Sequence, residues 1–162
     1  MPNTSSPGTT VFIQALLLTA LLAGSLDALS AIIQFTASGN REPARIFRYI
    51  SSALFGKPAL TGGTPMVITG VLLHYGIAFL WTLVFFLLYP HIPILSRQPA
   101  LSGIAYGILV WLIMNFAVVP LSRIGRFPSR LQPALIGCGI IIIAIGLPIS
   151  LLARRWLRPS TS

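Results

Sequence analysis

Acidic and thiol side chains are almost missing from this chain. Asp and Glu account for 2 of its 162 residues, and Cys138 is the single cysteine. One thiol excludes an internal disulfide and also excludes four-thiolate zinc or iron-sulfur sites. Charged residues make up 8% of the chain, whereas a soluble domain carries about 25%. The composition therefore excludes an ordinary soluble domain.

Apolar residues dominate, at 55% of the chain with a mean hydropathy of +0.87. The net charge of +9 comes from 11 Lys and Arg, and all of these lie between or after the apolar runs. Bases at such positions are typical of anchors at phospholipid headgroups. We therefore expect an integral membrane protein whose partner is membrane lipid, with no nucleic-acid partner. The predicted headgroup-binding residues are Arg45, Arg48, Arg123, Arg126, Arg154 and Arg155.

Four apolar runs are long enough to cross a bilayer, which takes about 20 helical residues. They are predicted to span residues 11–35, 66–89, 100–122 and 134–153. Joined by short polar connections, they predict an all-α integral membrane protein whose transmembrane helices form one antiparallel four-helix bundle, residues 11–153. Residues 1–10 are predicted to be a disordered tail, and residues 154–162 a basic tail.

A short amphipathic helix is predicted between the first two spans, at residues 44–55. Its predicted apolar side consists of Ile46, Phe47, Ile50 and Leu54, and its other side of Arg45, Arg48 and Tyr49. Such a helix lies in the membrane interface. We expect a surface linker, with a gate or binding lid over the bundle as the alternative.

Small residues predict two faces where helices pack closely. Gly24 and Ala28 lie one turn apart in the first span, and Gly103 and Gly107 form a GxxxG arrangement in the third. Small residues at this spacing let membrane helices approach closely. We predict all four as helix-packing residues, and we expect the glycine pair to join copies of the chain if it forms a homo-oligomer. Further along the third span, Pro120 predicts a kink.

Strong polar residues interrupt three of the apolar runs. They are Asp27 in the first span, His74 in the second and Asn115 in the third. Counted at 1.5 Å per residue from the face shared by the first and third connections, all three lie roughly 10 to 14 Å deep. In hydrocarbon, each can recover a hydrogen bond only from another polar group or from water. The sequence therefore predicts a buried polar centre made of Asp27, His74 and Asn115.

This polar centre has two interpretations. In the first, it fixes the register of the helices in a membrane scaffold or accessory protein, which contacts lipid or a membrane-protein partner. In the second, Asp27 and His74 exchange a proton, and the chain is a small proton-linked transporter or a subunit of one. The sequence alone favours the scaffold slightly.

Enzymatic roles have less support. A hydrolytic triad of Ser25 or Ser30 with His74 and Asp27 lacks any nucleophile motif. A haem with two axial histidines lacks its second one, since His91 is predicted in a loop, which leaves His74 with Met114 as the remaining haem-ligand alternative. There is no P-loop, no GxGxxG and no HExxH motif. We therefore expect no catalytic residue, metal or cofactor, and an enzyme is the less favoured class.

The basic residues predict the orientation of the bundle. The connections after spans one and three hold seven bases: Arg41, Arg45, Arg48, Lys57, Arg123, Arg126 and Arg130. The opposite side holds four: Arg97, Arg154, Arg155 and Arg158. Because positive residues concentrate on the cytoplasmic side, the connections after spans one and three are predicted to be cytoplasmic and both termini to lie across the membrane. The Arg-rich carboxyl tail disagrees with this orientation, because it would place these bases on the opposite side of the membrane from the cytoplasm.

Several short motifs follow one another between about residues 20 and 150. They are Gly24-Ser-Leu-Asp27, Arg48-Tyr-Ile-Ser-Ser52 with Gly56, Gly62-Gly63, Leu73-His74 with Ala78, and Met114-Asn-Phe-Ala-Val-Val-Pro120 with Leu121 and Ser122. As a set they resemble a group of small four-span bacterial inner-membrane proteins of unassigned function. The resemblance implies a single compact bundle in the bacterial inner (plasma) membrane, with periplasmic termini on the orientation above. It implies no activity, substrate or cofactor.

Overall fold

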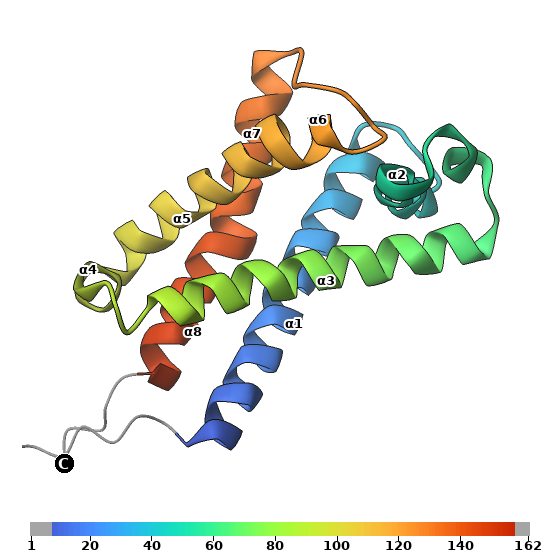
Figure 1. Ribbon diagram of the computed structural model, residues 1–162. Helices are drawn as coiled ribbons and strands as arrows, with labels where there is room; N and C mark the ends of the chain where they lie inside the picture. The colour runs from blue at the N-terminus through green and yellow to red at the C-terminus, as the bar shows by residue number, and fades with distance from the viewer. Residues whose placement is uncertain (1–7, 158–162) are drawn as a thin grey trace, which may run out of the picture.

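The computed structural model describes residues 8–157, and most of them are helical (Figure 1). Four helical units are long and apolar enough to cross a membrane: Thr9–Ala37, Thr64–Leu88, Pro99–Leu121 and Leu131–Leu157. The described part of the chain contains no strand. The protein is thus an all-α integral membrane protein with four membrane-spanning helices, as the sequence predicts.

Eleven helical segments make up these spans and their connections. The first span is α1 (Thr9–Ala37), followed by α2 (Ala44–Phe55) and the short 3-10 helix η1 (Lys57–Thr61). The second span is α3 (Thr64–Leu88), followed by α4 (Pro93–Arg97). The third span combines α5 (Pro99–Ile113), the π turn η2 (Met114–Val118) and α6 (Val119–Leu121). The fourth combines α7 (Leu131–Ile141), the π turn η3 (Ile142–Gly146) and α8 (Leu147–Leu157).

The first and last helices extend into the regions that were predicted to be tails, residues 1–10 and 154–162. Thr9 and Thr10 belong to α1, and Arg154 and Arg155 lie on α8, which continues to Leu157. The continued helix satisfies its own backbone hydrogen bonds, which favours helix over coil near the hydrocarbon. Residues 1–7 and 158–162 of the two tails lie outside the described residues.

The four spans alternate in direction, so α2 and the connection between α6 and α7 lie at one end of the bundle (Figure 1). The start of α1 and the end of α8 lie at the other end. The backbone N–H of Arg123 donates a hydrogen bond of 3.1 Å to the carbonyl of Ala53. This bond links the connection between α6 and α7 to α2. The two connections therefore share one end of the bundle, as predicted.

Helix α2 packs closely across the first part of α3. A Cβ added to Gly70 would lie 2.0 Å from the carbonyl oxygen of Phe47, so only glycine allows this crossing. Ser51 is fully buried there and donates a hydrogen bond to the carbonyl of Met66. Leu54, predicted on the apolar side, is 53% exposed because it lies past the crossing.

Glycines also set the closest contacts between the spans. A Cβ added to Gly146 would lie 2.1 Å from the carbonyl oxygen of Gly103, and one added to Gly107 would lie 2.7 Å from the Cα of Ile142. The GxxxG arrangement is therefore filled by the fourth span of the same chain. The expectation that it joins two copies is wrong for this face, because no second helix can reach a backbone already in contact.

The small face of α1 packs against α3. A Cβ added to Gly24 would meet the ring of Tyr75 at 3.0 Å and Ala78 at 3.1 Å. Ala28, one turn later, is half-buried. The role predicted for Gly24 in helix packing is thus confirmed.

Each π turn ends two residues before a proline. The turn at Met114–Val118 precedes Pro120, and the turn at Ile142–Gly146 precedes Pro148. Proline has no N–H and its ring clashes with the carbonyl four residues back. A wider turn moves that carbonyl away, so the kink predicted at Pro120 takes the form of a π turn.

The tightly packed core lies towards the end of the bundle opposite α2. Phe85, Phe86 and Ile149 are almost fully buried in it. Tyr106 donates a hydrogen bond of 2.6 Å to the carbonyl of Trp81, and Ser150 donates one of 2.7 Å to the carbonyl of Pro99. Close packing at this end contrasts with the cavity nearer α2.

Candidate functional site

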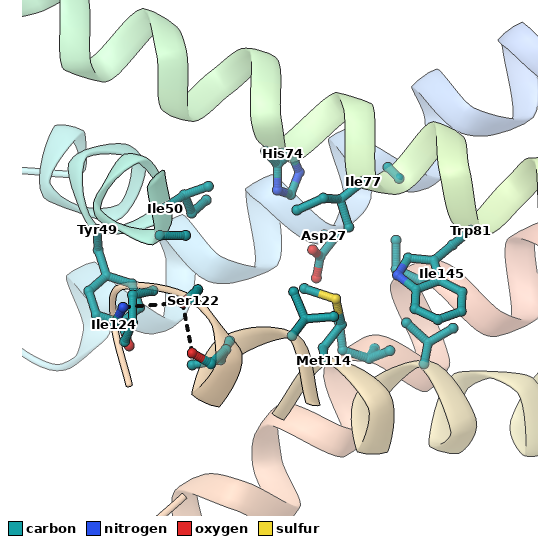
Figure 2. Close-up of a pocket in the computed structure, with 16 residues that line it drawn as sticks. Asp27, Tyr49, Ile50, His74, Ile77, Trp81, Met114, Ser122, Ile124 and Ile145 are labelled. Carbon is teal, nitrogen blue, oxygen red and sulfur yellow. Dashed lines mark hydrogen bonds between the residues drawn. The ribbon is translucent and has the colours of Figure 1, made fainter. Parts of the chain in front are cut away.

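A cavity of about 230 Å³ lies between α2 and the spans (Figure 2). Helix α1 contributes Asp27 to its wall, α3 contributes His74 and Trp81, the third span contributes Met114, and Ser122 directly follows that span. Apart from Tyr49 of α2, the rest of the wall consists of isoleucine, valine and alanine side chains. Among residues 8–157, no lysine or arginine lines it. The cavity is therefore apolar with one acid and one imidazole in its wall.

The carboxyl group of Asp27 points into this cavity, between His74 and Met114 in the view of Figure 2. Asp27 is half-buried, whereas Ala23 and Gly24 one turn earlier are buried against the bundle and set the rotation of α1. Within residues 8–157 the carboxyl group has no hydrogen bond, and its electrostatic partner is His74. An unpaired carboxylate among apolar side chains is costly, so this group needs a proton or a positive partner.

The imidazole of His74 is oriented by the backbone of α1. Its Nε2 lies 2.8 Å from the carbonyl oxygen of Gly24. Because a carbonyl oxygen only accepts, Nε2 must carry the hydrogen. Nδ1 is then the nitrogen that gains or loses a proton. The ring of Phe47 on α2 approaches the imidazole edge-on at a centroid distance of 6.4 Å.

Asn115 does not join these two residues. It is half-buried, does not line the cavity, and donates from Nδ2 to the carbonyl of Trp111 over 2.9 Å. The amide thus bonds within its own helix, beside the start of the π turn at Met114. The prediction that Asn115 belongs to the polar centre is therefore wrong, and the structure does not show a fully buried centre, because Asp27 and His74 are only partly buried.

The sequence analysis missed several residues of the cavity wall. Trp81 follows His74 by seven residues, and this helical spacing places both on one face of α3. The seven-residue spacing could therefore have identified Trp81 as a neighbour of His74 from the sequence. Tyr49 was assigned to the polar side of α2, but it lines the cavity while remaining 44% exposed.

The geometry disagrees with the two enzymatic alternatives. Ser25 shares a hydrogen bond of 3.0 Å with the hydroxyl of Tyr75, and Ser30 donates one to the carbonyl of Leu26. Neither serine contacts His74, so the hydrolytic triad is wrong. The hydrogen on Nε2 of His74 also prevents this nitrogen from binding a haem iron. In the part of the chain described, no three His, Cys, Asp or Glu side chains cluster as metal ligands would.

The predicted headgroup anchors have different surroundings. Arg48 forms an ion pair of 2.7 Å with Glu42 and is only 21% exposed. Its guanidinium group is therefore paired within the protein and is less accessible to lipid headgroups. Arg154 is half-buried on α8. The exposed ones are Arg45, Arg123, Arg126 and Arg155. Three of these four lie at the α2 end of the bundle.

Comparisons with protein families, curated proteins and solved structures give no match to this chain. The resemblance to small four-span bacterial proteins therefore stays a prediction. The cavity and the residues of its wall are the structural basis for proposing a function.

Proposed function

We propose that this protein is a small proton-linked membrane transporter, or a subunit of one, in which Asp27 and His74 form the protonatable centre. The observation that carries the proposal is that both side chains face one cavity, to whose wall the described part of the chain contributes no lysine or arginine. An acid and an imidazole on one site can hold and pass a proton, and intramembrane acids are typical of proton relays.

A purely structural role fits the cavity less well. A polar group that only fixes helix register is expected to bond another helix, but Asp27 faces open space. Empty volume also lowers stability, because the atoms that line it lose packing contacts. A scaffold would gain stability by filling a cavity of about 230 Å³. We therefore place the transporter ahead of the scaffold that the sequence alone favours.

Few side chains of the cavity wall can bind a proton. The titratable residues of the wall are Asp27 from α1, Tyr49 from α2 and His74 from α3, and the third and fourth spans bring none. An intramembrane acid and an imidazole are typical members of a proton relay, so we propose that Asp27 and His74 share the exchangeable proton. We propose that the cavity opens on the cytoplasmic side of a bacterial inner membrane, where the more basic connections lie.

Infrared difference spectroscopy of the reconstituted protein tests the protonatable centre. Asp27 and Glu42 are the only acids, so a Glu42→Gln background leaves Asp27 as the only side-chain carboxyl group. We expect its carboxyl band to change with pH, and the change to shift in a His74→Gln variant, because neighbouring ionisable groups influence each other's protonation. Asp27→Asn must remove the band, and circular dichroism must show that each variant is folded. A band that stays constant with pH would mean a sealed structural group and would overturn the proposal.

A further inference from the structure

The cavity wall favours a positively charged ligand. Ten of the chain's 11 lysines and arginines lie within the described residues 8–157, and none of these ten lines the cavity, where Asp27 is the single acid. An anion would find no countercharge there. Trp81 and Tyr49 add aromatic rings, whose faces attract cations. A ligand held by this wall is therefore a cation with an apolar body.

The volume limits the size of that body. A cavity of about 150 Å³ lined by apolar side chains holds benzene. The present cavity, at about 230 Å³, has room for one ring or a short alkyl chain with an attached amino group. The isoleucine and valine side chains of the wall suit the apolar part, and the carboxylate suits the ammonium group.

A groove on the outer surface adjoins the cavity. It runs between α2, α3 and α6, and it shares Ile50, Ile77 and Val118 with the cavity wall. Two leucines of the groove, Leu54 and Leu121, are 53% and 87% exposed, as expected of side chains that face lipid. Because only shared side chains separate the two spaces, movement of these side chains would give membrane-dissolved molecules a route into the cavity.

The groove itself discriminates against charge. Arg123, which is exposed, is the only charged residue that the described chain places in it. A guanidinium and the surrounding hydrocarbon both disfavour passage of a cation. An amine, in contrast, can pass as the uncharged base and gain a proton inside.

We infer that the cavity binds a small lipophilic amine, which enters through the groove and is held as an ammonium ion by Asp27. The inference rests on the proposed proton centre. The amine leaves its own proton in the water, passes the groove as the base, and takes the proton held by Asp27 and His74. The net change is one ammonium ion bound and one proton released to the solvent. Amine and proton therefore exchange at one site.

Calorimetric titration of the full-length protein with benzylamine tests this exchange. In two buffers of different ionisation enthalpy, we expect one proton released per benzylammonium bound when the carboxyl group starts protonated. Asp27→Asn is expected to weaken binding roughly tenfold or more, because it removes a hydrogen bond to a charged group. Glu42→Gln, which removes the acid outside the cavity, should leave binding unchanged. Benzyl alcohol has the same shape without the charge and should bind weakly to all three proteins.

A second variant addresses the groove without touching Asp27. Val118→Phe enlarges a residue shared by the groove and the cavity, and we expect it to abolish or slow benzylamine binding. Leu112→Phe on the same span is the matched control, because Leu112 is similarly exposed and lines neither space. Equal binding of benzylamine to the wild type and both phenylalanine variants would overturn entry through the groove.

The outcomes separate this inference from the proposed function. Benzyl alcohol binding as tightly as benzylamine, with no effect of Asp27→Asn, would mean an apolar space that any lipid chain fills, and would overturn the amine site. A titrating Asp27 band without benzylamine binding would overturn the inference alone. A constant band in a protein that binds benzylamine without proton release would overturn the proton-linked function.

Discussion

The Nε2 of His74 on α3 donates a hydrogen bond of 2.8 Å to the carbonyl oxygen of Gly24 on α1. Gly24 is also the point where the two helices meet closely, since an added Cβ would lie 3.0 Å from the Tyr75 ring. One residue therefore provides both the close approach and the acceptor that orients the imidazole. Asp27 follows three residues later and faces the cavity that His74 also lines.

This hydrogen bond predicts the tautomer of His74. The chain has two histidines, so a His91→Gln variant leaves His74 as the only imidazole. Above its titration, we expect the neutral ring to carry its hydrogen on Nε2, because the carbonyl of Gly24 only accepts. Nitrogen NMR of the ¹⁵N-labelled imidazole distinguishes the two tautomers. A neutral ring protonated on Nδ1 would contradict the bond.

Gly70→Ala should displace α2 from α3. The new Cβ would lie 2.0 Å from the carbonyl oxygen of Phe47, so the two helices must separate. We expect a loss of roughly 1–3 kcal/mol in unfolding free energy, the usual range for overpacking. Thermal unfolding followed by circular dichroism measures the change.

The control for that variant lies on the same helix. A Cβ at Gly76 would meet nothing within 4 Å, so Gly76→Ala should leave stability unchanged or raise it slightly. Similar destabilisation by both substitutions would show that the crossing at Gly70 is not the cause.

Gly146→Ala should loosen the contact between the third and fourth spans. The added Cβ would lie 2.1 Å from the carbonyl oxygen of Gly103, a backbone atom that cannot move alone. We expect a loss of about 1–3 kcal/mol in unfolding free energy. Gly139→Ala in the same span is the control, because its Cβ would have open space. An unchanged unfolding transition in Gly146→Ala would contradict the close packing of these spans.

Ser150→Ala removes a buried hydrogen bond between the fourth span and the start of the third. Its hydroxyl donates to the carbonyl of Pro99 over 2.7 Å and is fully buried. Interhelical hydrogen bonds in membranes contribute about 0.6 kcal/mol on average, up to about 1.7. We expect a loss within this range in the unfolding free energy, measured by denaturant titration in mixed micelles. Ser30→Ala, whose hydroxyl bonds only its own helix, should lose less.

Apolar run length and the spacing of polar residues predict much of this fold. About 20 apolar residues must form a helix in a membrane, because no water is present to satisfy the backbone. The four spans, the bounds of α2 and the packing role of Gly24 therefore follow from local pattern. The pairing of Asp27 with His74 at one depth follows in the same way, since depth along a straight helix is a matter of counting.

Only the tertiary structure decided which partners these residues meet. Depth does not determine rotation about the helix axis, and Asn115 bonds within its own helix while Asp27 and His74 face a shared cavity. The GxxxG arrangement likewise predicts close contact at Gly103, but any helix could supply the partner. That the partner is Gly146 of the same chain depends on how all four spans pack together, which no single stretch of sequence contains.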